Sequence, residues 1–348
     1  MDAYLSWLDH GNSARGSRES ALAWTSPNTV ALELSTMRLR DFSRNSSGRP
    51  VLICAPCALH RAQIADFAAG HSIVESLRQA GLDRIYVTDW RSASSDMRYL
   101  SIDSYLGDLN VAVDDLGSPV DLVGLCQGGW LSLVFAARFP EKVRRLVLVG
   151  APVDLSIEST LSQVARSMPQ AVLEQLVARG GGNVSGEEML NLWSPSLSNV
   201  EIEATLQRPL LSAEALHGRE LLERFRQWNE ETLDLPGAYY RQVINWIFRE
   251  NRIATGRFVA LGRPIDLHEL KTPVFLVVGR NDEVVPAEQA LATSQLLGTP
   301  APLMHTVIEP CNHLGLFMGA GTHAGSWRHI AGWLGSEPAG FRARTIPA

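Results

Sequence analysis

The chain has 348 residues, 45% of them hydrophobic and 20% charged, a composition typical of a globular protein with one large domain. A formal net charge of −6 leaves no basic surface to neutralise phosphates, which argues against nucleic acid as a partner. No run approaches the roughly 18 apolar residues of a membrane span, and the acidic start lacks the pattern of a signal peptide. Four cysteines are too few for a disulfide framework, so we expect a reducing, cytoplasmic setting.

Short β-rich apolar runs alternate with helical stretches, which predicts an α/β fold with a mostly parallel sheet covered by helices on both faces. We expect a lead-in over residues 1–28 and a first strand over residues 29–38. Buried strands are expected over residues 51–54, 84–88, 120–123, 145–149 and 274–278, and a further strand over residues 306–309. Helices are expected between them, over residues 73–80, 102–116 and 131–139.

The strand pattern stops between residues 155 and 253, where the sequence is helical in texture. Since a strand follows at Val274, we interpret this segment as a helical cap inserted into a core of residues 29–154 and 254–338. The cap would cover the carboxyl ends of the strands, where an open α/β sheet places its active site. A separate helical domain is the alternative. Under either interpretation, helices are expected over residues 158–168, 171–177, 186–192, 213–228 and 239–250.

Residues 123–130 read Val-Gly-Leu-Cys-Gln-Gly-Gly-Trp and lie between an expected strand and an expected helix. This is the context of a G-x-S-x-G nucleophile elbow, with Cys126 in place of the serine. Gly124, Gly128 and Gly129 remove side chains where the turn is tight and the helix presses on the sheet. The functional interpretation is a cysteine nucleophile, and the alternative is a buried structural cysteine beside a glycine-rich turn.

A cysteine nucleophile needs a base that takes its proton and a third group that orients the base. In this kind of fold the chain order is nucleophile, acid, histidine. Asp282 lies in the loop after the strand at 274–278, and His313 lies in a loop after the last strand, ahead of a helix. Among nine histidines, only His313 has this position and order. We therefore predict a Cys126–His313–Asp282 triad; an ordinary turn aspartate and a surface histidine are the alternatives.

The oxyanion hole is expected to use the backbone N–H of Gln127 and a second N–H from the loop after residues 51–54. Pro56 has no N–H, so the second donor is Cys57 or Ala58. His60, in the same loop, either contacts substrate or is a plain loop histidine. Cys54 and Cys57 match C-x-x-C, but they end a strand and have no second pair, so neither a metal nor a redox role is expected.

Aromatic residues of the cap are candidates for lining an apolar substrate channel, and Trp130 after the elbow is another. Aromatic side chains at helical spacing more often belong simply to the core. The cap candidates for substrate binding are Trp228 and Tyr240, beside Trp193, Tyr239, Trp246 and Phe248.

Several motifs together resemble the polyhydroxyalkanoate synthase family, and its two-subunit, short-chain class most of all. They are Gly-Leu-Cys-Gln-Gly-Gly (124–129), Phe-Pro-Glu-Lys-Val (139–143), Ala-Pro-Val-Asp-Leu (151–155), Val-Thr-Asp-Trp (87–90), Asn-Arg-Ile-Ala-Thr-Gly (251–256) and the loops at 279–286 and 312–315. The resemblance implies an α/β-hydrolase core in which Cys126 carries the growing polymer, His313 is the base and Asp282 its partner. It also implies (R)-3-hydroxyacyl-CoA as substrate, with no metal and no cofactor.

Two segments are more similar to intracellular polyhydroxyalkanoate depolymerases, which also use a cysteine. They are Ala-Pro-Cys-Ala-Leu-His (55–60) and Asp-Leu-Pro-Gly-Ala-Tyr-Tyr (234–240). Those enzymes, however, carry a proline after Cys-Gln where this sequence has Gly128 and Gly129.

Three functions therefore remain open. The first is polymerisation of hydroxyacyl-CoA; the second is a depolymerase or thioesterase with the same triad and water as acceptor. The third is a non-catalytic scaffold. The resemblance leaves a second copy of the chain, a second subunit and the surface of polymer granules open as partners.

Overall fold

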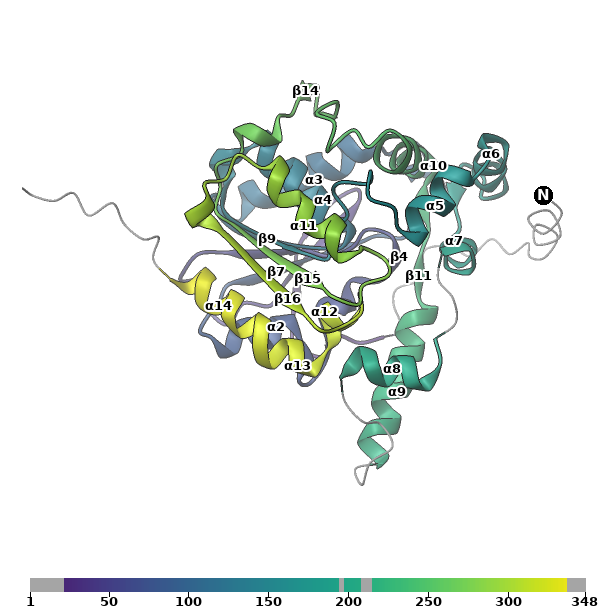
Figure 1. Ribbon diagram of the computed structural model, residues 1–348. Helices are drawn as coiled ribbons and strands as arrows, with labels where there is room; N and C mark the ends of the chain where they lie inside the picture. Colours follow the sequence, from purple (N-terminus) through teal and green to yellow (C-terminus); the bar gives the residue numbers. More distant parts are fainter. Residues whose placement is uncertain (1–21, 194–196, 208–214, 337–348) are drawn as a thin grey trace, which may run out of the picture.

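The computed structural model describes residues 22–193, 197–207 and 215–336 (Figure 1). An eight-stranded sheet forms the centre, in the order β1-β2-β7-β3-β8-β9-β15-β16. Six neighbouring strands from β7 to β16 are parallel, and β1 and β2 are antiparallel. The strands are β1 (Thr29–Glu33), β2 (Met37–Asp41), β3 (Val51–Cys54), β7 (Ile85–Trp90), β8 (Val120–Leu125), β9 (Val143–Val149), β15 (Val274–Gly279) and β16 (Met304–Glu309).

The central strands are buried along their whole length, as expected of parallel strands covered on both faces. Every residue of β8 is buried, and Ile53 of β3 pairs with Val123 of β8. The strands predicted from residue 51 onward are confirmed, and none of their ends is shifted by more than two residues. Among these strands, β16 alone has no buried residue, because it lies at the edge of the sheet and has a neighbouring strand on one side only.

The single strand predicted over residues 29–38 is wrong. The chain turns between β1 and β2, where the N–H of Leu34 donates to the carbonyl oxygen of Met37 at 2.8 Å. Thr36 is fully buried at this turn, and its N–H and hydroxyl both donate to a carboxylate oxygen of Asp108. The hairpin is therefore held by a contact with a helix 72 residues away, which the local pattern does not reveal.

Helices cover both faces of the sheet (Figure 1). α3 (Ile102–Asp115), α4 (Gln127–Arg138) and α11 (Ala287–Leu296) lie on one face. The other face carries α2 (Ile73–Gln79), α12 (Gly315–Met318), α13 (Ala320–Thr322) and α14 (Arg328–Gly335), with the π-helix η8 (His323–Trp327). Short 3-10 helices lie in the connections: η2 (Ala62–Ala65), η3 (Ser95–Met97), η4 (Pro140–Lys142), η6 (Leu267–Glu269) and η7 (Ala301–Leu303). The mostly parallel α/β architecture is as predicted.

The segment between β9 and β15 begins with helices that lie beyond one side of the sheet (Figure 1). They are α5 (Thr160–Ser167), α6 (Gln170–Arg179), α7 (Gly186–Trp193), α8 (Asn199–Leu206), α9 (Ala215–Glu230), α10 (Gly237–Gln242) and the π-helix η5 (Val243–Arg249). We refer to residues 155–253 as the cap. Helix α8 was not predicted, and the predicted helix over 239–250 is α10 continued as η5. Residues 1–21 of the predicted lead-in and residues 337–338 of the predicted core lie outside the described residues.

Short strands also occur where the sequence suggested helices only. β10 (Asn183–Val184) pairs with β12 (Leu235–Pro236), and β11 (Thr232–Leu233) pairs with β4 (Leu59–His60) of the core. The β4–β11 pair joins the cap to the loop that follows β3. Two further pairs lie in the core: β5 (Asp66–Ala68) with β6 (His71–Ser72), and β13 (Val259–Ala260) with β14 (Arg263–Pro264).

Across the described residues, no helix has both the length and the apolar character that a membrane crossing requires.

Candidate active site

Cys126 occupies a strained turn between β8 and α4. Its backbone has φ 48° and ψ −115°, a conformation that residues with a side chain rarely adopt. The turn is fixed on both sides: the N–H of Cys126 donates to the carbonyl oxygen of Val149 at 2.9 Å, and the Cys126 carbonyl accepts from the N–H of Gly129 at 2.8 Å. The Cys126 side chain is half-buried and free of disulfides. This is the strand–turn–helix geometry of a nucleophile elbow.

Close packing at the elbow explains Gly128. A Cβ atom there would lie 2.1 Å from the carbonyl oxygen of Cys54, closer than any two such atoms can come. A Cβ on Gly124 would similarly lie 2.5 Å from the Cα of Gly129. Gly128 therefore lets the first turn of α4 contact the end of β3, and Gly124 lets the same turn lie close to β8.

Asp282 and His313 meet although they follow different strands. Nδ1 of His313 lies 2.7 Å from Oδ2 of Asp282, and both side chains are buried. The other carboxylate oxygen accepts the backbone N–H groups of Val284 and Val285 at 2.9 Å and 2.7 Å. The imidazole lies against the end of β9, since a Cβ on Gly150 would be 3.1 Å from its Cε1 atom. The carboxylate is thus held in place and directed at Nδ1.

Charge around His313 favours the protonated ring. Burial alone would lower its pKa, but the charges of Asp282 and Cys126, with hydrogen bonds to both, raise the pKa of His313 well above its usual value. Cys126 therefore lies near enough to the imidazole to affect its charge. With Nδ1 facing Asp282, Nε2 is the atom left for the thiol. The structure brings together all three residues of the predicted triad.

The predicted oxyanion-hole residues lie on two segments that face each other. Gln127 is the first residue of α4, where helix geometry leaves the backbone N–H without an acceptor in the helix. Cys57 and Ala58 lie in the loop after β3, against which Gly128 packs. Cys57 is fully buried, and its Sγ atom donates to Oε1 of Gln127 at 3.8 Å.

The two cysteines of the C-x-x-C pair are both free and buried. Burial raises the pKa of Cys54 to about 12, against the opposing effect of hydrogen bonds with Ser132 and Thr88. Burial also raises the pKa of Cys57, which keeps it a neutral thiol. Within the described parts of the chain, no three His, Cys, Asp or Glu side chains gather as a group able to hold a metal ion.

His60 lies at the border between core and cap. It belongs to β4, pairs with Thr232 of β11, and its ring lies 4.4 Å from the ring of Trp228. Burial lowers the pKa of His60 to about 4, so the ring is neutral near pH 7. Its Nδ1 atom is buried and, within the part of the chain that the structure describes, has no hydrogen-bond partner.

The three aromatic candidates for substrate binding are packed in the protein interior. Trp130 is 1% exposed on α4. Trp228 is fully buried, and its indole N–H donates to the carbonyl oxygen of Arg61 at 3.1 Å. The hydroxyl of Tyr240 accepts from the indole N–H of Trp193 at 3.3 Å, and burial raises the pKa of Tyr240 to about 12. Each side chain has the packing of a core residue in this structure.

Two cap residues contact the catalytic loops in ways that sequence reasoning missed. The hydroxyl of Tyr239, on α10, lies 2.7 Å from Sγ of Cys57. Thr205, on the unpredicted helix α8, accepts a hydrogen bond at 2.8 Å from the side-chain amide of Asn312, the residue before His313. The sequence identifies Tyr239 and Thr205 as polar residues of the cap, but it does not identify the residues that they contact.

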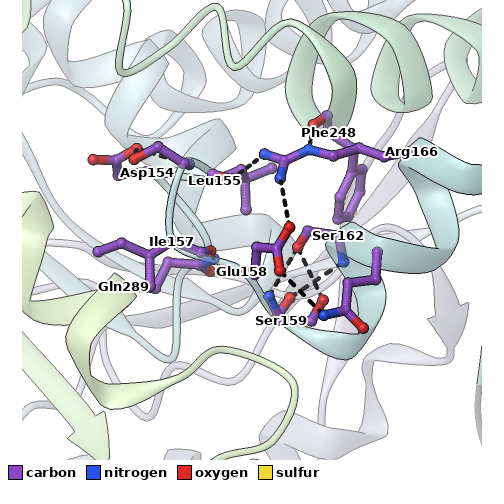
Figure 2. Close-up of polar contacts among 11 residues, drawn as sticks. Asp154, Leu155, Ile157, Glu158, Ser159, Ser162, Arg166, Phe248 and Gln289 are labelled. Atoms are coloured by element: carbon purple, nitrogen blue, oxygen red, sulfur yellow. Dashed lines mark hydrogen bonds and ion pairs between the residues drawn. The ribbon is translucent and has the colours of Figure 1, made fainter.

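The two ends of the cap are fastened to each other. Where the chain enters the cap, the N–H of Leu155 donates to Oδ1 of Asn251, which lies near the other end of the cap. The amide nitrogen of Asn251 donates to Asp154 at 2.9 Å. Figure 2 shows Arg166 of α5 between the carbonyl oxygens of Leu155 and Phe248, to which it donates.

The core contributes to the same junction. Gln289, on α11, donates to the carbonyl oxygen of Ile157 at 2.7 Å, and both residues are labelled in Figure 2. α11 follows the loop that carries Asp282. The start of the cap is therefore connected, through α11, to the loop that carries Asp282.

Known proteins share this architecture. A family model described as the alpha/beta hydrolase fold matches residues 71–320. Among solved structures, a monoacylglycerol lipase of Paleococcus ferrophilus is similar with a TM-score of 0.52 and 16% identity, over 86% of this chain and 98% of that one. An alpha/beta hydrolase fold protein from Chitinophaga pinensis has a TM-score of 0.53 and 16% identity, over 90% and 98% of the two chains. At these identities the likeness concerns the fold alone.

Relatives with similar sequences identify the family within this fold. The poly(3-hydroxyalkanoate) polymerase subunit PhaC of Synechocystis sp. is 30% identical, over 85% of this chain and 80% of the relative. The proteins of the same name from Allochromatium vinosum and Haloferax mediterranei are 28% and 26% identical, over 81% and 88% of this chain. The chain spans 80% of the length of the first of these two and 63% of the second. The chain therefore has the α/β-hydrolase fold and belongs to the poly(3-hydroxyalkanoate) polymerase family.

Proposed function

We propose that this chain is an acyltransferase that polymerises (R)-3-hydroxyacyl-CoA, with Cys126 as nucleophile, His313 as base and Asp282 as the group that orients the base. The observation that carries the proposal is the thiol at the elbow, beside the buried His313–Asp282 pair, in a chain 30% identical to a poly(3-hydroxyalkanoate) polymerase subunit.

The first half-reaction loads the cysteine. The raised pKa of His313 favours a state in which Nε2 already holds the proton given up by Sγ of Cys126. The Cys126 thiolate attacks the thioester carbonyl of the acyl-CoA. The resulting oxyanion accepts hydrogen bonds from the backbone N–H of Gln127 and from that of Cys57 or Ala58. The intermediate collapses, the C–S bond to CoA breaks, and the CoA thiolate takes the proton from His313. Cys126 then carries the acyl group as a thioester.

The second half-reaction forms the ester bond. His313 takes the proton of the 3-hydroxyl group of a second hydroxyacyl-CoA, and the oxygen attacks the acyl-Cys126 carbonyl. The cysteine leaves as a thiolate and takes the proton back from His313, while the dimer remains on CoA. Cys126 can accept that longer acyl group in the next round. Since each loading exchanges one thioester for another, it is nearly neutral in free energy, whereas a serine ester would trap the chain.

His60 is the substrate contact best supported by its environment. Its neutral ring has a buried nitrogen without a partner in the described structure, at the border between the oxyanion loop and the cap. A hydroxyl or carbonyl group of the acyl chain would satisfy that nitrogen. Trp130, Trp228 and Tyr240 would line an acyl channel only after the packing around them opens.

The setting and partners follow from the same proposal. The substrate is an acyl-CoA or a polyester chain, and the reaction takes place in the cytoplasm at the surface of the growing polymer granule. The relatives named as subunits of a polymerase support a second subunit of the two-subunit class. A homodimer through the cap is the other assembly that the family resemblance suggests.

Hydrolysis by the same residues is the alternative function, and the loop at residues 55–60 favours it by its resemblance to depolymerases. Against it, the depolymerases carry proline at the position of Gly128, where the Cys54 carbonyl leaves no room for a Cβ in this structure.

The test incubates the purified protein with (R)-3-hydroxybutyryl-CoA and follows free CoA and the size of the product. The proposal expects CoA release with a long-chain or insoluble product, abolished in Cys126→Ala. CoA release with free hydroxyacid alone would make the protein a thioesterase. If CoA is not released, even with a second subunit of the polymerase present, the polymerase proposal is wrong and hydrolysis of preformed polyester becomes the next assay.

A further inference from the structure

A hydrogen-bonded line of three side chains runs from the cap to the nucleophile elbow. The hydroxyl of Tyr239 lies 2.7 Å from Sγ of Cys57, and Sγ of Cys57 donates to Oε1 of Gln127 at 3.8 Å. These residues are 182 and 70 positions apart in the sequence. They bring together cap helix α10, the loop after β3 and the first turn of α4. We call this line the Tyr239 relay.

The proton order in the relay is determined by its chemistry. The amide oxygen of Gln127 can only accept, so the single proton of the Cys57 thiol is directed at it. The hydroxyl of Tyr239 must then donate to the sulfur. Burial raises the pKa of Cys57 and holds that of Tyr239 well above its usual value, so both groups stay protonated at neutral pH. Each hydrogen bond of the relay is therefore donated in the same direction, from the cap towards the elbow.

The relay ends on the two segments that supply the oxyanion hole. Gln127 provides one backbone N–H, and Cys57 or its neighbour Ala58 provides the other. A side-chain hydrogen bond between Cys57 and Gln127 limits how far these segments can move apart. Oxyanion stabilisation depends on that separation, because a donor acts only when it lies about 3 Å from the developing charge.

We propose that Tyr239 is a positioning residue: through Cys57 and Gln127 it fixes the spacing of the oxyanion-hole donors, so that the cap takes part in the chemistry. This inference rests on the proposed function in that it takes Cys126 as an acyl-accepting nucleophile. It adds a dependence of transition-state stabilisation on a cap hydroxyl that never touches the substrate.

The ring of Tyr239 is held independently of its hydroxyl. It is fully buried and lies 4.3 Å from the ring of Tyr105, which lies 5.1 Å from the ring of Trp90. The indole N–H of Trp90 in turn donates to the carbonyl oxygen of Ala55, at the start of the oxyanion loop. Removing only the hydroxyl should therefore leave the aromatic packing in place.

Tyr105 offers a matched control. Its hydroxyl is also buried in the same stack of rings, but within the described part of the chain it has no hydrogen-bond partner. Tyr105→Phe removes an equivalent oxygen atom and breaks no bond of the relay. Comparison of Tyr239→Phe with Tyr105→Phe thus separates the effect of breaking the hydrogen bond to Cys57 from the effect of removing a buried hydroxyl.

The experiment compares two reactions of Cys126 in the full-length protein. Acylation by p-nitrophenyl acetate passes through an oxyanion, and its burst of p-nitrophenolate is measured. Alkylation by iodoacetamide needs the thiolate but no oxyanion, and it is followed on the peptide that contains Cys126. We expect Tyr239→Phe to slow acylation about 10-fold, less than the loss of a whole oxyanion donor, and to leave alkylation unchanged. Tyr105→Phe should change neither rate.

Variants of Cys57 test the middle of the relay. Cys57→Ala should slow acylation as Tyr239→Phe does, and Cys57→Ser, which keeps a donor and an acceptor, should recover part of the rate. The double variant Tyr239→Phe/Cys57→Ala should be no slower than Cys57→Ala alone, because both changes break one relay.

Two results would overturn the inference. Equal slowing of acylation and alkylation in Tyr239→Phe would place the effect on the thiol itself, and equal acylation rates in Tyr239→Phe and wild type would leave the relay without a role. A wild-type protein that is not acylated on Cys126 at all would instead contradict the proposed nucleophile. The two failures are therefore distinct.

Discussion

The carboxylate of Asp282 is shared between the backbone and His313: Oδ2 lies 2.7 Å from Nδ1 of the imidazole, while Oδ1 accepts the N–H groups of Val284 and Val285. Oδ1 is thus committed to the loop, and Oδ2 is left for the ring. This arrangement favours a proton on Nδ1 and leaves Nε2 to exchange a proton with Cys126.

Asp282→Asn should abolish most activity without unfolding the protein. The amide oxygen can still accept from Val284 and Val285, but the amide nitrogen then faces Nδ1 of His313 and favours the wrong tautomer. We expect the rate of CoA release to fall by about 100-fold or more in a protein that remains folded. Asp266→Asn is the control, since Asp266 is exposed and caps η6. Equal activities of the Asp282 and Asp266 variants would contradict the role of Asp282.

Stability should depend on pH through His313. Its pKa is raised well above the unfolded value of about 6.5, so between that value and the folded pKa the native state binds more protons than the unfolded chain. The free energy of unfolding contributed by His313 is therefore fully present below about pH 6.5 and is lost as the pH rises through the folded pKa.

Urea unfolding of wild type and His313→Gln, at intervals from about pH 6 to about pH 9, checks this dependence. The difference in unfolding free energy between the two proteins should shrink as the pH rises. Parallel curves, or a difference that grows with pH, would show that His313 is not held in its charged form by Asp282 and Cys126.

Gly128 should tolerate no larger residue. Gly128→Ala places a Cβ 2.1 Å from the Cys54 carbonyl oxygen, so either α4 or the oxyanion loop must shift, at a cost of about 1–3 kcal/mol in unfolding free energy. Gly107→Ala is the matched helical control, because nothing lies within 4 Å of its Cβ position. That variant should instead gain about 0.5–1 kcal/mol. Chemical denaturation measures both, and similar values for the two variants would be inconsistent with the close approach.

The central strands, and the placement of Cys126, Asp282 and His313 at the same edge of the sheet, could be predicted from the sequence because both depend on local patterns. β8 and β15 are buried runs, Cys126 directly follows β8, and Asp282 and His313 lie in the loops after β15 and β16. At the carboxyl edge of a parallel sheet, such residues come together whatever the details of the loops.

Contacts between distant segments could not be predicted in this way. The turn at Thr36 depends on Asp108, and the contact of Tyr239 with Cys57 joins residues 182 positions apart. Helix α8 has a weakly amphipathic sequence, so it gave no clear periodic signal, yet its Thr205 reaches the loop of His313. A single sequence shows which side chains are polar, but it does not show which distant residues they contact in the folded protein.

The cap should move relative to the core to admit substrate. If the cap helices cover the carboxyl ends of the strands, as the sequence predicts, they would block entry of substrate in a fixed position. The two ends of the cap are fastened to each other through Asn251 and Arg166, so the motion is expected in the helices between them. Hydrogen exchange should therefore be faster in α5 and α6 than in β3 and β8, with the amide of Leu155 protected by its bond to Asn251. Cap helices as protected as the central strands would count against entry by cap motion.

The central claim is that Cys126 carries a growing acyl chain. The most direct measurement is mass spectrometry of the protein quenched in acid during reaction with (R)-3-hydroxybutyryl-CoA, followed by mapping of the modified peptide. The account predicts a ladder of masses, spaced by one hydroxybutyryl unit, on the peptide that contains Cys126. Hydroxylamine should remove the ladder, because the link is a thioester. A single hydroxybutyryl adduct, an adduct on another residue, or CoA release from an unmodified Cys126 would contradict it.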